Sequence, residues 1–381
     1  MPKPTRTIAA VLTAASRRWA SFTVAFALVT STSLGDGPKP DEEVTLYPTT
    51  GWFDAAARQW VVPVRGCIYE PETNSVKRRA LLALLAERLK LDESQTPLFR
   101  ERARPFLVDH ERAKVLDVAC SGATCRCGPS QPNGQFTAEV RIGLPEGAAA
   151  PKSDDTVTLS IQTRDGDTRS FSASAQLLAP TGICVITDID DTVKLTDVPD
   201  VKEMLRNTFL RPYQAVPGMP RLLTALRDAG ASVHYVSASP WQLLAPLQAM
   251  FAGEGLPAGS MHLKTFRWKD ETFFDLFASP ESFKLPILRE QLRRYPGRRF
   301  ILIGDTSERD PEIYAQIARE FPDQVAAILI RIAAPSQWST QRSKQAFKDV
   351  PAPVTAFTDP AEVYIPSVLE SAGVSKASPQ P

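Results

Sequence analysis

Three carboxylates follow an uncharged run in the stretch 182–198, GICVITDIDDTVKLTDV. The run 183–187 reads as a buried strand, and Asp188, Asp190 and Asp191 come directly after it. Carboxylates that share a pocket repel one another and lose hydration, so they stay ionised only beside a cation. The stretch therefore predicts a site that holds positive charge.

Further polar residues follow other short apolar runs or open a helical pattern, namely Ser237, Ser239, Lys284, Asp305 and Asp310. Ligands bind outside the carboxyl ends of the strands in open parallel sheets, so we expect these residues to converge at one sheet edge. Oxygen ligands without clustered His or Cys suit a hard cation, Mg²⁺ before Ca²⁺. A hydroxyl and an ammonium beside such a metal make a site for phosphate.

The pattern that must position these residues changes near residue 181. After it, short apolar runs alternate with helical patterns such as 220–230 and 283–294. This alternation predicts an α/β fold, a parallel sheet with helices on both faces. From residue 43 to about 178 the apolar residues mostly alternate with polar ones. This predicts a β-rich, sandwich-like N-terminal domain, interrupted by one helix with Leu81, Leu84, Leu85 and Leu89 on one face.

Length and charge bound the remaining possibilities. A chain of 381 residues with 43% hydrophobic residues favours two domains over one. We expect a signal peptide and linker in 1–40, the β-rich domain in 41–180, the catalytic domain in 181–370 and a disordered tail in 371–381. Lys plus Arg (44) balance Asp plus Glu (43), so no whole-protein field attracts nucleic acid, and no nucleic-acid partner is expected.

The N-terminus has the three parts of a secretory signal. Basic residues precede an apolar run at 20–29, and small residues follow at 30–33. The run is too short to span a bilayer, so we expect a secreted or periplasmic protein. A cytosolic protein with a disordered or amphipathic start is the alternative.

The content of five cysteines is compatible with an exported protein. Cys120, Cys125 and Cys127 lie close together in the sequence with no histidine nearby, which makes a zinc site weak. In an oxidising compartment a disulfide from Cys120 to Cys125 or Cys127 is the better expectation. The odd total leaves a free thiol, for which Cys184 in the apolar run is the natural candidate.

Several linked motifs resemble a known family. DIDDT at 188–192, Ser237 after a strand, Lys284 on a helix, and Gly304-Asp305 with Asp310 resemble, in order, the four motifs of haloacid-dehalogenase (HAD)-like phosphatases. The longer stretches TDIDDTVKLTDV, NTFLRPYQAVPGMP, HYVSASPWQL, FRWKD and GDTSERDPEIY are similar to the catalytic domain of App1-type phosphatidate phosphatases. The resemblance covers roughly residues 43–335 and implies a Rossmann-like parallel sheet.

The resemblance also implies a mechanism. Asp188 would attack phosphorus and form an aspartyl-phosphate, and Asp190 would act as general acid and base. Ser237, Ser239 and Lys284 would bind the phosphate. Mg²⁺ would be held by Asp188, the backbone carbonyl of Asp190, and Asp305, with Asp310 in direct or near-direct support.

The implied substrate is a phosphorylated one. Phosphatidate, hydrolysed to diacylglycerol and phosphate, fits the resemblance best and would bring peripheral contact with a membrane. A soluble phosphomonoester is the alternative. A hypothesis from another class keeps the fold without catalysis, as a lipid- or protein-binding module.

Each assignment also has a plainer interpretation. Asp188 and Asp190 could end a strand and begin a turn, and Asp191 reads best as such a turn residue. A Ca²⁺ loop fails at Val193, where the EF-hand turn needs Gly, and at Pro199, where it needs Glu. Asp310 reads well as a helix N-cap, because Pro311 follows it.

Overall fold

The structure is a computed structural model that describes residues 37–71, 96–265, 280–333 and 335–374, with isolated positions between 76 and 90. The described residues form one compact unit with two sheets. The expected signal peptide and the tail from residue 375 lie outside the described residues, so export stays a prediction of the sequence. Among the described helices, none is long and apolar enough to cross a bilayer.

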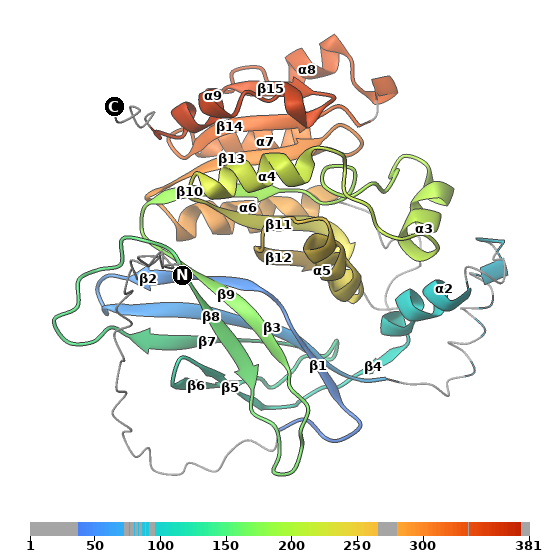
Figure 1. Ribbon diagram of the computed structural model, residues 1–381, viewed down its shortest axis with the longest axis vertical. Helices are drawn as coiled ribbons and strands as arrows, with labels where there is room; N and C mark the ends of the chain where they lie inside the picture. The colour runs from blue at the N-terminus through green and yellow to red at the C-terminus, as the bar shows by residue number, and fades with distance from the viewer. Residues whose placement is uncertain are drawn as a thin grey trace, which may run out of the picture. The chain divides into compact units, whose positions relative to one another are not determined.

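Six parallel strands form the C-terminal sheet, in the order β12-β11-β10-β13-β14-β15 (Figure 1). Their bounds are β10 Gly182–Thr187, β11 Ala231–Pro240, β12 Ser260–Lys264, β13 Arg298–Asp305, β14 Val325–Arg331 and β15 Val354–Phe357. Counted along the chain this order is 3-2-1-4-5-6, which reverses between β10 and β13. A crevice at such a reversal is where ligands bind in open α/β sheets. The predicted α/β fold class is confirmed.

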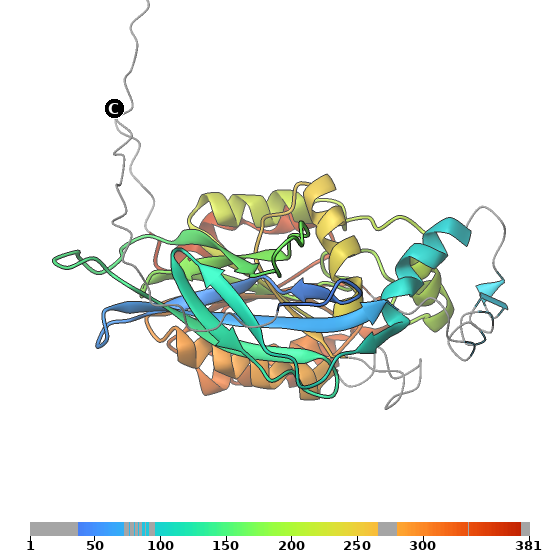
Figure 2. The same cartoon turned by 90° about the horizontal axis from the view of Figure 1, so that it is seen from below.

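Helices cover both faces of this sheet because its strands are apolar on both faces. Ile183 and Val185 face one core, with α4, α5 and α9, whereas Cys184 and Ile186 face a second core, with α6 and α7. Figure 2 shows α4 and α6 on opposite sides of the sheet. The helices are α3 Val201–Phe209, α4 Met219–Asp228, α5 Leu244–Gly253, α6 Pro280–Arg294, α7 Asp310–Glu320, α8 Thr340–Ala346 and α9 Ile365–Ser371.

The N-terminal sheet is the β-rich region that the alternation predicts. Its nine strands are one hydrogen-bonded sheet, β1-β3-β2-β9-β8-β5-β6, with β4 and β7 also paired to β3. The sheet curls so that β6 lies against β7 around one apolar core, which gives a sandwich-like form without a second separate sheet. The strands are β1 Glu43–Leu46, β2 Thr49–Asp54, β3 Gln59–Pro71, β4 Val108–His110, β5 Leu116–Cys120, β6 Ala123–Cys127, β7 Gln135–Gly143, β8 Asp155–Ile161 and β9 Ser172–Leu178.

The helical insertion lies partly outside the described residues, which exclude Leu81, Leu84 and Leu85. Leu89 is helical and buried, as predicted. After it, α2 (Thr96–Ala103) buries Phe99 in the same apolar core as Leu89 and the α3 residue Phe209. The insertion therefore shares a core with the C-terminal sheet.

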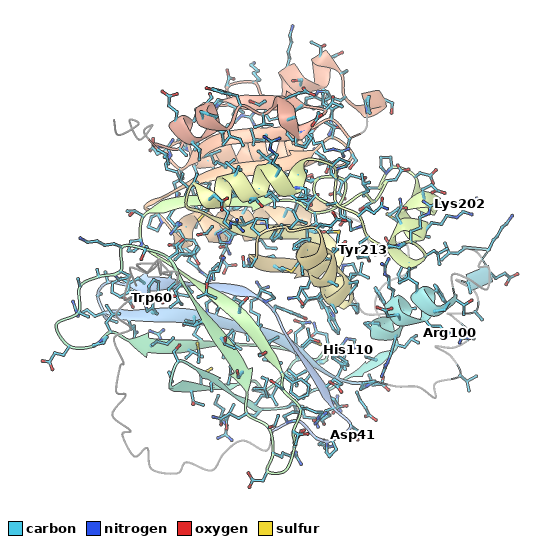
Figure 3. All side chains as sticks on the ribbon, in the orientation of Figure 1. Asp41, Trp60, Arg100, His110, Lys202 and Tyr213 are labelled. Atoms are coloured by element: carbon cyan, nitrogen blue, oxygen red, sulfur yellow. The ribbon has the colours of Figure 1, made fainter. Side chains whose placement is uncertain are left out.

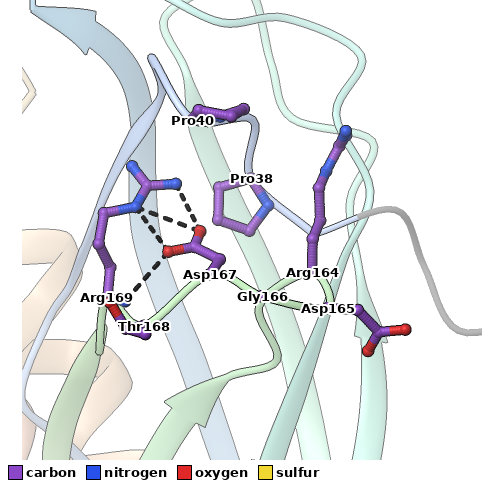
Figure 4. A pocket seen from close by; sticks show the side chains of 8 residues that line it. All are labelled: Pro38, Pro40, Arg164, Asp165, Gly166, Asp167, Thr168 and Arg169. Atoms are coloured by element: carbon purple, nitrogen blue, oxygen red, sulfur yellow. Dashed lines mark hydrogen bonds and ion pairs between the residues drawn. The ribbon is translucent and has the colours of Figure 1, made fainter.

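Residues 37–40, the end of the expected linker, make defined contacts with the N-terminal sheet. Gly37 and Pro38 are buried, and Arg164 donates a hydrogen bond to the Gly37 carbonyl at 3.2 Å. The segment borders a shallow cavity of about 420 Å³ beside the turn 164–169, where Arg169 binds Asp167 through two nitrogens (Figure 4). The segment is held in place because this turn supplies partners for its backbone.

All five cysteines are free, so the disulfide expected from Cys120 to Cys125 or Cys127 is not present. Cys125 and Cys127 are two residues apart on strand β6, and their sulfurs are 3.6 Å apart. A disulfide requires about 2.05 Å between the sulfurs. Cys184 is buried and free, as predicted.

A buried guanidinium joins the two sheets. Arg298, which begins β13, donates to both carboxylate oxygens of Asp154 at 2.8 and 2.9 Å and to the backbone carbonyls of Ala179 and Ile183. Ser232, the second residue of β11, also donates to Asp154. Burial alone would raise the pKa of Asp154, but hydrogen bonds from Arg298 and Ser232 lower it below its ordinary value of 3.8.

We expect Asp154→Asn to lower the free energy of unfolding by about 2 kcal/mol at pH 7, because it leaves the Arg298 charge buried without its counterion. The folded-state pKa of Asp154 is depressed, so its contribution is complete above about pH 4 and disappears as the pH falls through that pKa. Urea unfolding at pH 7 and near pH 3 should therefore show a difference from wild type that narrows in acid. Asp165→Asn, in an exposed turn, is the control, and a difference independent of pH would contradict the assignment.

Candidate active site

Two adjacent strands bring the first and last acidic motifs together. Asp188 follows β10 directly, and Asp305 is the last residue of β13. Thr187 is paired with Ile303 across the two strands, and the Asp188 amide donates to the Ile303 carbonyl at 2.9 Å. The candidate site therefore lies at the carboxyl ends of the strands, at the reversal of strand order.

Three carboxylates and one ammonium meet there, as the sequence predicts. Asp188, Asp305 and Asp310 each offer an oxygen within 4.8 Å of the others, and all three are buried. Lys284 Nζ lies 2.8 Å from Asp188 Oδ1 and 2.6 Å from Asp310 Oδ1. It also donates to Glu308 Oε2 at 3.0 Å. This oxygen-rich cluster has the donor set of a hard divalent cation.

Asp310 reaches the cluster from the first turn of α7. The helix begins at Asp310, with Arg309 at the N-cap position, so the expected N-cap role of Asp310 is wrong. Its carboxylate instead binds Lys284 and accepts a weak hydrogen bond from the Asp305 amide at 3.4 Å. A Cβ on Gly304 would lie 2.4 Å from Asp310 Oδ2, so the close approach of this carboxylate requires glycine there.

Charge and burial oppose each other in this cluster. Burial raises the pKa of Asp188 well above its ordinary value, although the charge of Lys284 counteracts the rise. Burial and the charge of Asp310 raise the pKa of Asp305 to about 7. Burial would lower the pKa of Lys284, but the carboxylates of Asp188, Asp310 and Glu308 raise it well above its ordinary value. One ammonium among four acidic groups leaves an excess of negative charge that a further cation would relieve.

Asp190 lies in a separate set of contacts. Ser237 and Ser239, both on β11, donate to its Oδ2 at 2.9 and 2.6 Å. Lys194 Nζ and the Thr196 hydroxyl each lie 2.8 Å from its Oδ1. Burial alone would raise the pKa of Asp190, but the Lys194 charge and these hydrogen bonds lower it to about 2. The two serines predicted to bind phosphate are thus aimed at the predicted general acid.

The loop between these two aspartates is held by Asp191 and Thr192. Asp191 has a positive φ of 57°, and its carboxylate accepts hydrogen bonds from the amides of Thr196, Asp197 and Val198. It is the turn residue that the sequence favours. The Thr192 hydroxyl lies 3.2 Å from Asp188 and 2.8 Å from Asp305, so it links the ends of β10 and β13.

Sequence reasoning missed three side chains that contact the site, Lys194, Thr196 and Glu308. All three lie inside the quoted stretches TDIDDTVKLTDV and GDTSERDPEIY. An isolated lysine or threonine in a loop carries no signal of its own, since only the turn at Asp191 brings both onto Asp190. The resemblance to a family was the available signal, because the stretches extend beyond the four short motifs.

The catalytic-domain model of phosphatidate phosphatase APP1 matches residues 183–332. Phosphatidate phosphatase APP1 of Saccharomyces cerevisiae is 34% identical over 174 residues, which are 45% of this chain and 29% of that protein. An uncharacterized protein of Schizosaccharomyces pombe is 32% identical over 183 residues, 47% of this chain and 30% of that protein. The chain thus spans less than a third of the length of these two curated relatives.

Among solved structures, a D,D-heptose 1,7-bisphosphate phosphatase from B. bronchiseptica, complexed with magnesium and phosphate, covers 50% of this chain and 99% of its own. It is 19% identical with a TM-score of 0.31, which is too low to add to the fold described above. The family match, by contrast, spans the strands and motifs that form the acidic cluster, from β10 to the end of β14. Residues 183–332 of this chain are therefore similar to the catalytic domain of phosphatidate phosphatase APP1.

Proposed function

We propose that the protein is a phosphoric monoester hydrolase that forms an aspartyl-phosphate on Asp188, and that phosphatidate is its substrate. One observation carries the proposal: Lys284 Nζ lies 2.8 Å from Asp188 Oδ1, with Asp305 and Asp310 in the same cluster. These residues come from separate parts of the chain, and an arrangement of one cation among several buried carboxylates suits the binding of a phosphate with a metal.

The first step is a displacement at phosphorus. Asp188 forms a bond to phosphorus as the bond to the ester oxygen breaks, and Asp190 gives that oxygen a proton. In the second step Asp190 takes a proton from water as the water oxygen attacks the aspartyl-phosphate, which releases phosphate and restores Asp188. Lys284 stabilises the negative charge shared by nucleophile and phosphate.

Ser237 and Ser239 have a second role when substrate is present. Their hydroxyls rotate freely about the Cβ–Oγ bond, and both donate to Asp190 Oδ2. A phosphate oxygen is a stronger acceptor when it carries charge, so the hydroxyls can turn to it. Both residues stand on β11, next to β10, which supports their assignment as phosphate ligands.

Mg²⁺ is the metal that we propose for this site, held by Asp188, Asp305 and the backbone carbonyl of Asp190, with support from Asp310. The raised pKa values of Asp188 and Asp305 support it, because both carboxylates lack sufficient positive charge. When bound, the ion would supply positive charge beside the phosphoryl oxygens. The hard oxygen donors of the cluster fit this ion better than a soft one.

Replacing the nucleophile tests the reaction. We expect Asp188→Asn to lower kcat at least about 1,000-fold, because an amide oxygen does not form a stable acyl phosphate. Wild type quenched in acid after mixing with ³²P-labelled substrate should carry a hydroxylamine-sensitive label that the variant lacks. Asp323→Asn, an exposed residue after α7, should match wild type. Undiminished turnover by Asp188→Asn would reject the mechanism, whereas the absence of turnover in wild type itself would favour a non-catalytic binding module.

Removing divalent cations tests the metal. We expect EDTA to abolish turnover and added Mg²⁺ to restore it. Independently of activity, Mg²⁺ should raise the Tm of wild type, because an ion that binds only the folded state stabilises it. This rise should be lost in Asp305→Asn, which removes one charged ligand. Full activity in EDTA, or an equal Tm rise in both proteins, would contradict the assignment.

A substrate panel separates the lipid from the soluble alternative. The family match supports phosphatidate, which we expect to be hydrolysed with a kcat/KM above those of soluble sugar and nucleotide monophosphates. Phosphatidate and lysophosphatidate should be presented in vesicles and in detergent, since a lipid substrate implies peripheral membrane contact. Indifference to phosphatidate together with fast turnover of a soluble ester would reject the lipid proposal and leave the reaction class intact.

A further inference from the structure

The two oxygens of Asp190 have different kinds of partner. Oδ1 is bonded by Lys194 and Thr196, each at 2.8 Å, while Oδ2, among the residues that the structure describes, accepts the hydroxyls of Ser237 and Ser239. All five residues are buried. The serine hydroxyls can turn away by rotation about one bond, but an ammonium cannot leave its counterion in a buried site without a large cost. Oδ1 is therefore fixed and Oδ2 is exchangeable.

Lys194 is itself held on more than one side. Its side chain is 1% exposed, and its Nζ donates to Thr196 Oγ1 at 2.6 Å as well as binding Asp190. The ammonium also lies 4.8 Å from the centre of the Tyr213 ring, a distance at which a cation is attracted to an aromatic ring. Tyr213 lies in the segment after α3. Figure 3 labels Tyr213 and the α3 residue Lys202.

Arg102, on α2 in the N-terminal region, also contacts Tyr213. Its guanidinium lies 3.7 Å from the centre of the Tyr213 ring and donates to the carbonyls of Thr208 and Arg211 at 2.7 Å each. Asn207 in the same segment donates from Nδ2 to the Thr196 carbonyl at 3.0 Å. A continuous series of contacts therefore runs from α2 through the segment 207–213 to the partners of Asp190.

We propose that Lys194, supported by Tyr213 and Arg102, is a positioning residue that fixes Asp190 through Oδ1, so that Oδ2 is the oxygen that transfers the proton to the leaving group. The proposal rests on the role of Asp190 as general acid. On entry of the phosphate, Ser237 and Ser239 turn to its oxygens and Oδ2 loses its two donors. The carboxyl group keeps its orientation because the contacts at Oδ1 remain.

In the first step, formation of the aspartyl-phosphate, this positioning matters only where the leaving oxygen needs a proton. The second step, in which Asp190 takes a proton from water, is the same for every ester, so the two classes are compared by the rate of the first step. An alkoxide is a poor leaving group, so hydrolysis of an alkyl phosphate depends on the general acid. A 4-nitrophenolate leaves without protonation, so its phosphate ester does not. A loss of Asp190 positioning should therefore be selective for alkyl esters, whereas general damage to the fold or to phosphate binding should slow both classes equally.

The test compares Lys194→Met with wild type on 4-nitrophenyl phosphate and on an alkyl phosphate that wild type hydrolyses. We expect the rate of aspartyl-phosphate formation, measured in a single turnover, to fall about 100-fold on the alkyl ester, at the low end of the usual effect of a general acid. On the aryl ester this first-step rate should fall less than about 5-fold. Lys202→Met, an exposed lysine on α3, should match wild type on both esters.

Two further variants keep the test informative if Lys194→Met does not fold. Tyr213→Leu removes the ring beside the ammonium and should show the same selectivity, at about 5–10-fold on the alkyl ester. Tyr213→Phe retains the ring, and the Tyr213 hydroxyl that it removes has no hydrogen-bond partner among the described residues, so this variant should keep most of the alkyl activity. Equal losses on both esters, or none on either, would overturn the proposal.

Asp190→Asn separates this inference from the proposed function. If Asp190→Asn slows the alkyl ester selectively and Lys194→Met does not, the general acid stands and the role of Lys194 is rejected. If Asp190→Asn slows aspartyl-phosphate formation from both esters equally, Asp190 is not the general acid and both proposals fall. The same selectivity in both variants is the supporting result.

Discussion

The buried ammonium of Lys284 is the interaction on which the site depends. Moving a charged group out of water costs several kcal/mol, which only close counterions offset. Lys284 comes from α6, and it binds Asp188 after β10 and both Glu308 and Asp310 after β13. The parallel strand order brings these segments to one edge. The fold must therefore be complete before any of these charges can be buried at a tolerable cost.

Asp188 and Asp190, which are only two residues apart, have opposite pKa shifts, and a second ammonium, that of Lys194, contributes to the shift at Asp190. In the ligand-free site, burial favours the protonated form of Asp188, whereas Lys194 and its neighbours favour the ionised form of Asp190. The proposed reaction needs the reverse, an ionised nucleophile and a protonated acid. A dianionic phosphate beside Asp190 raises its affinity for a proton, and added positive charge beside Asp188 favours its carboxylate. The substrate and cation would thus convert the resting charges into the reactive ones.

The convergence of Asp188 and Asp305 could be predicted from sequence, because each follows an apolar run and parallel strands end at the same edge. The contact of Lys194 with Asp190 could not, since it depends on the positive φ of Asp191, a backbone feature that local composition does not specify. In the N-terminal region, the alternation predicts β structure over 43–178 as a whole. It does not mark β9, with the sequence SASAQLL, because small and polar residues obscure its alternation.

The N-terminal region contributes to the geometry of the site as well as to the bulk of the protein. Phe99 and Phe106 share an apolar core with residues of the parallel sheet, and Arg298 binds Asp154 across the boundary between the sheets. Arg102 binds the carbonyls of the segment that packs against Lys194. The N-terminal sheet also has an apolar core of its own, but the residues shared with the core of the parallel sheet and the contacts of Arg102 couple the N-terminal region physically to the orientation of Asp190.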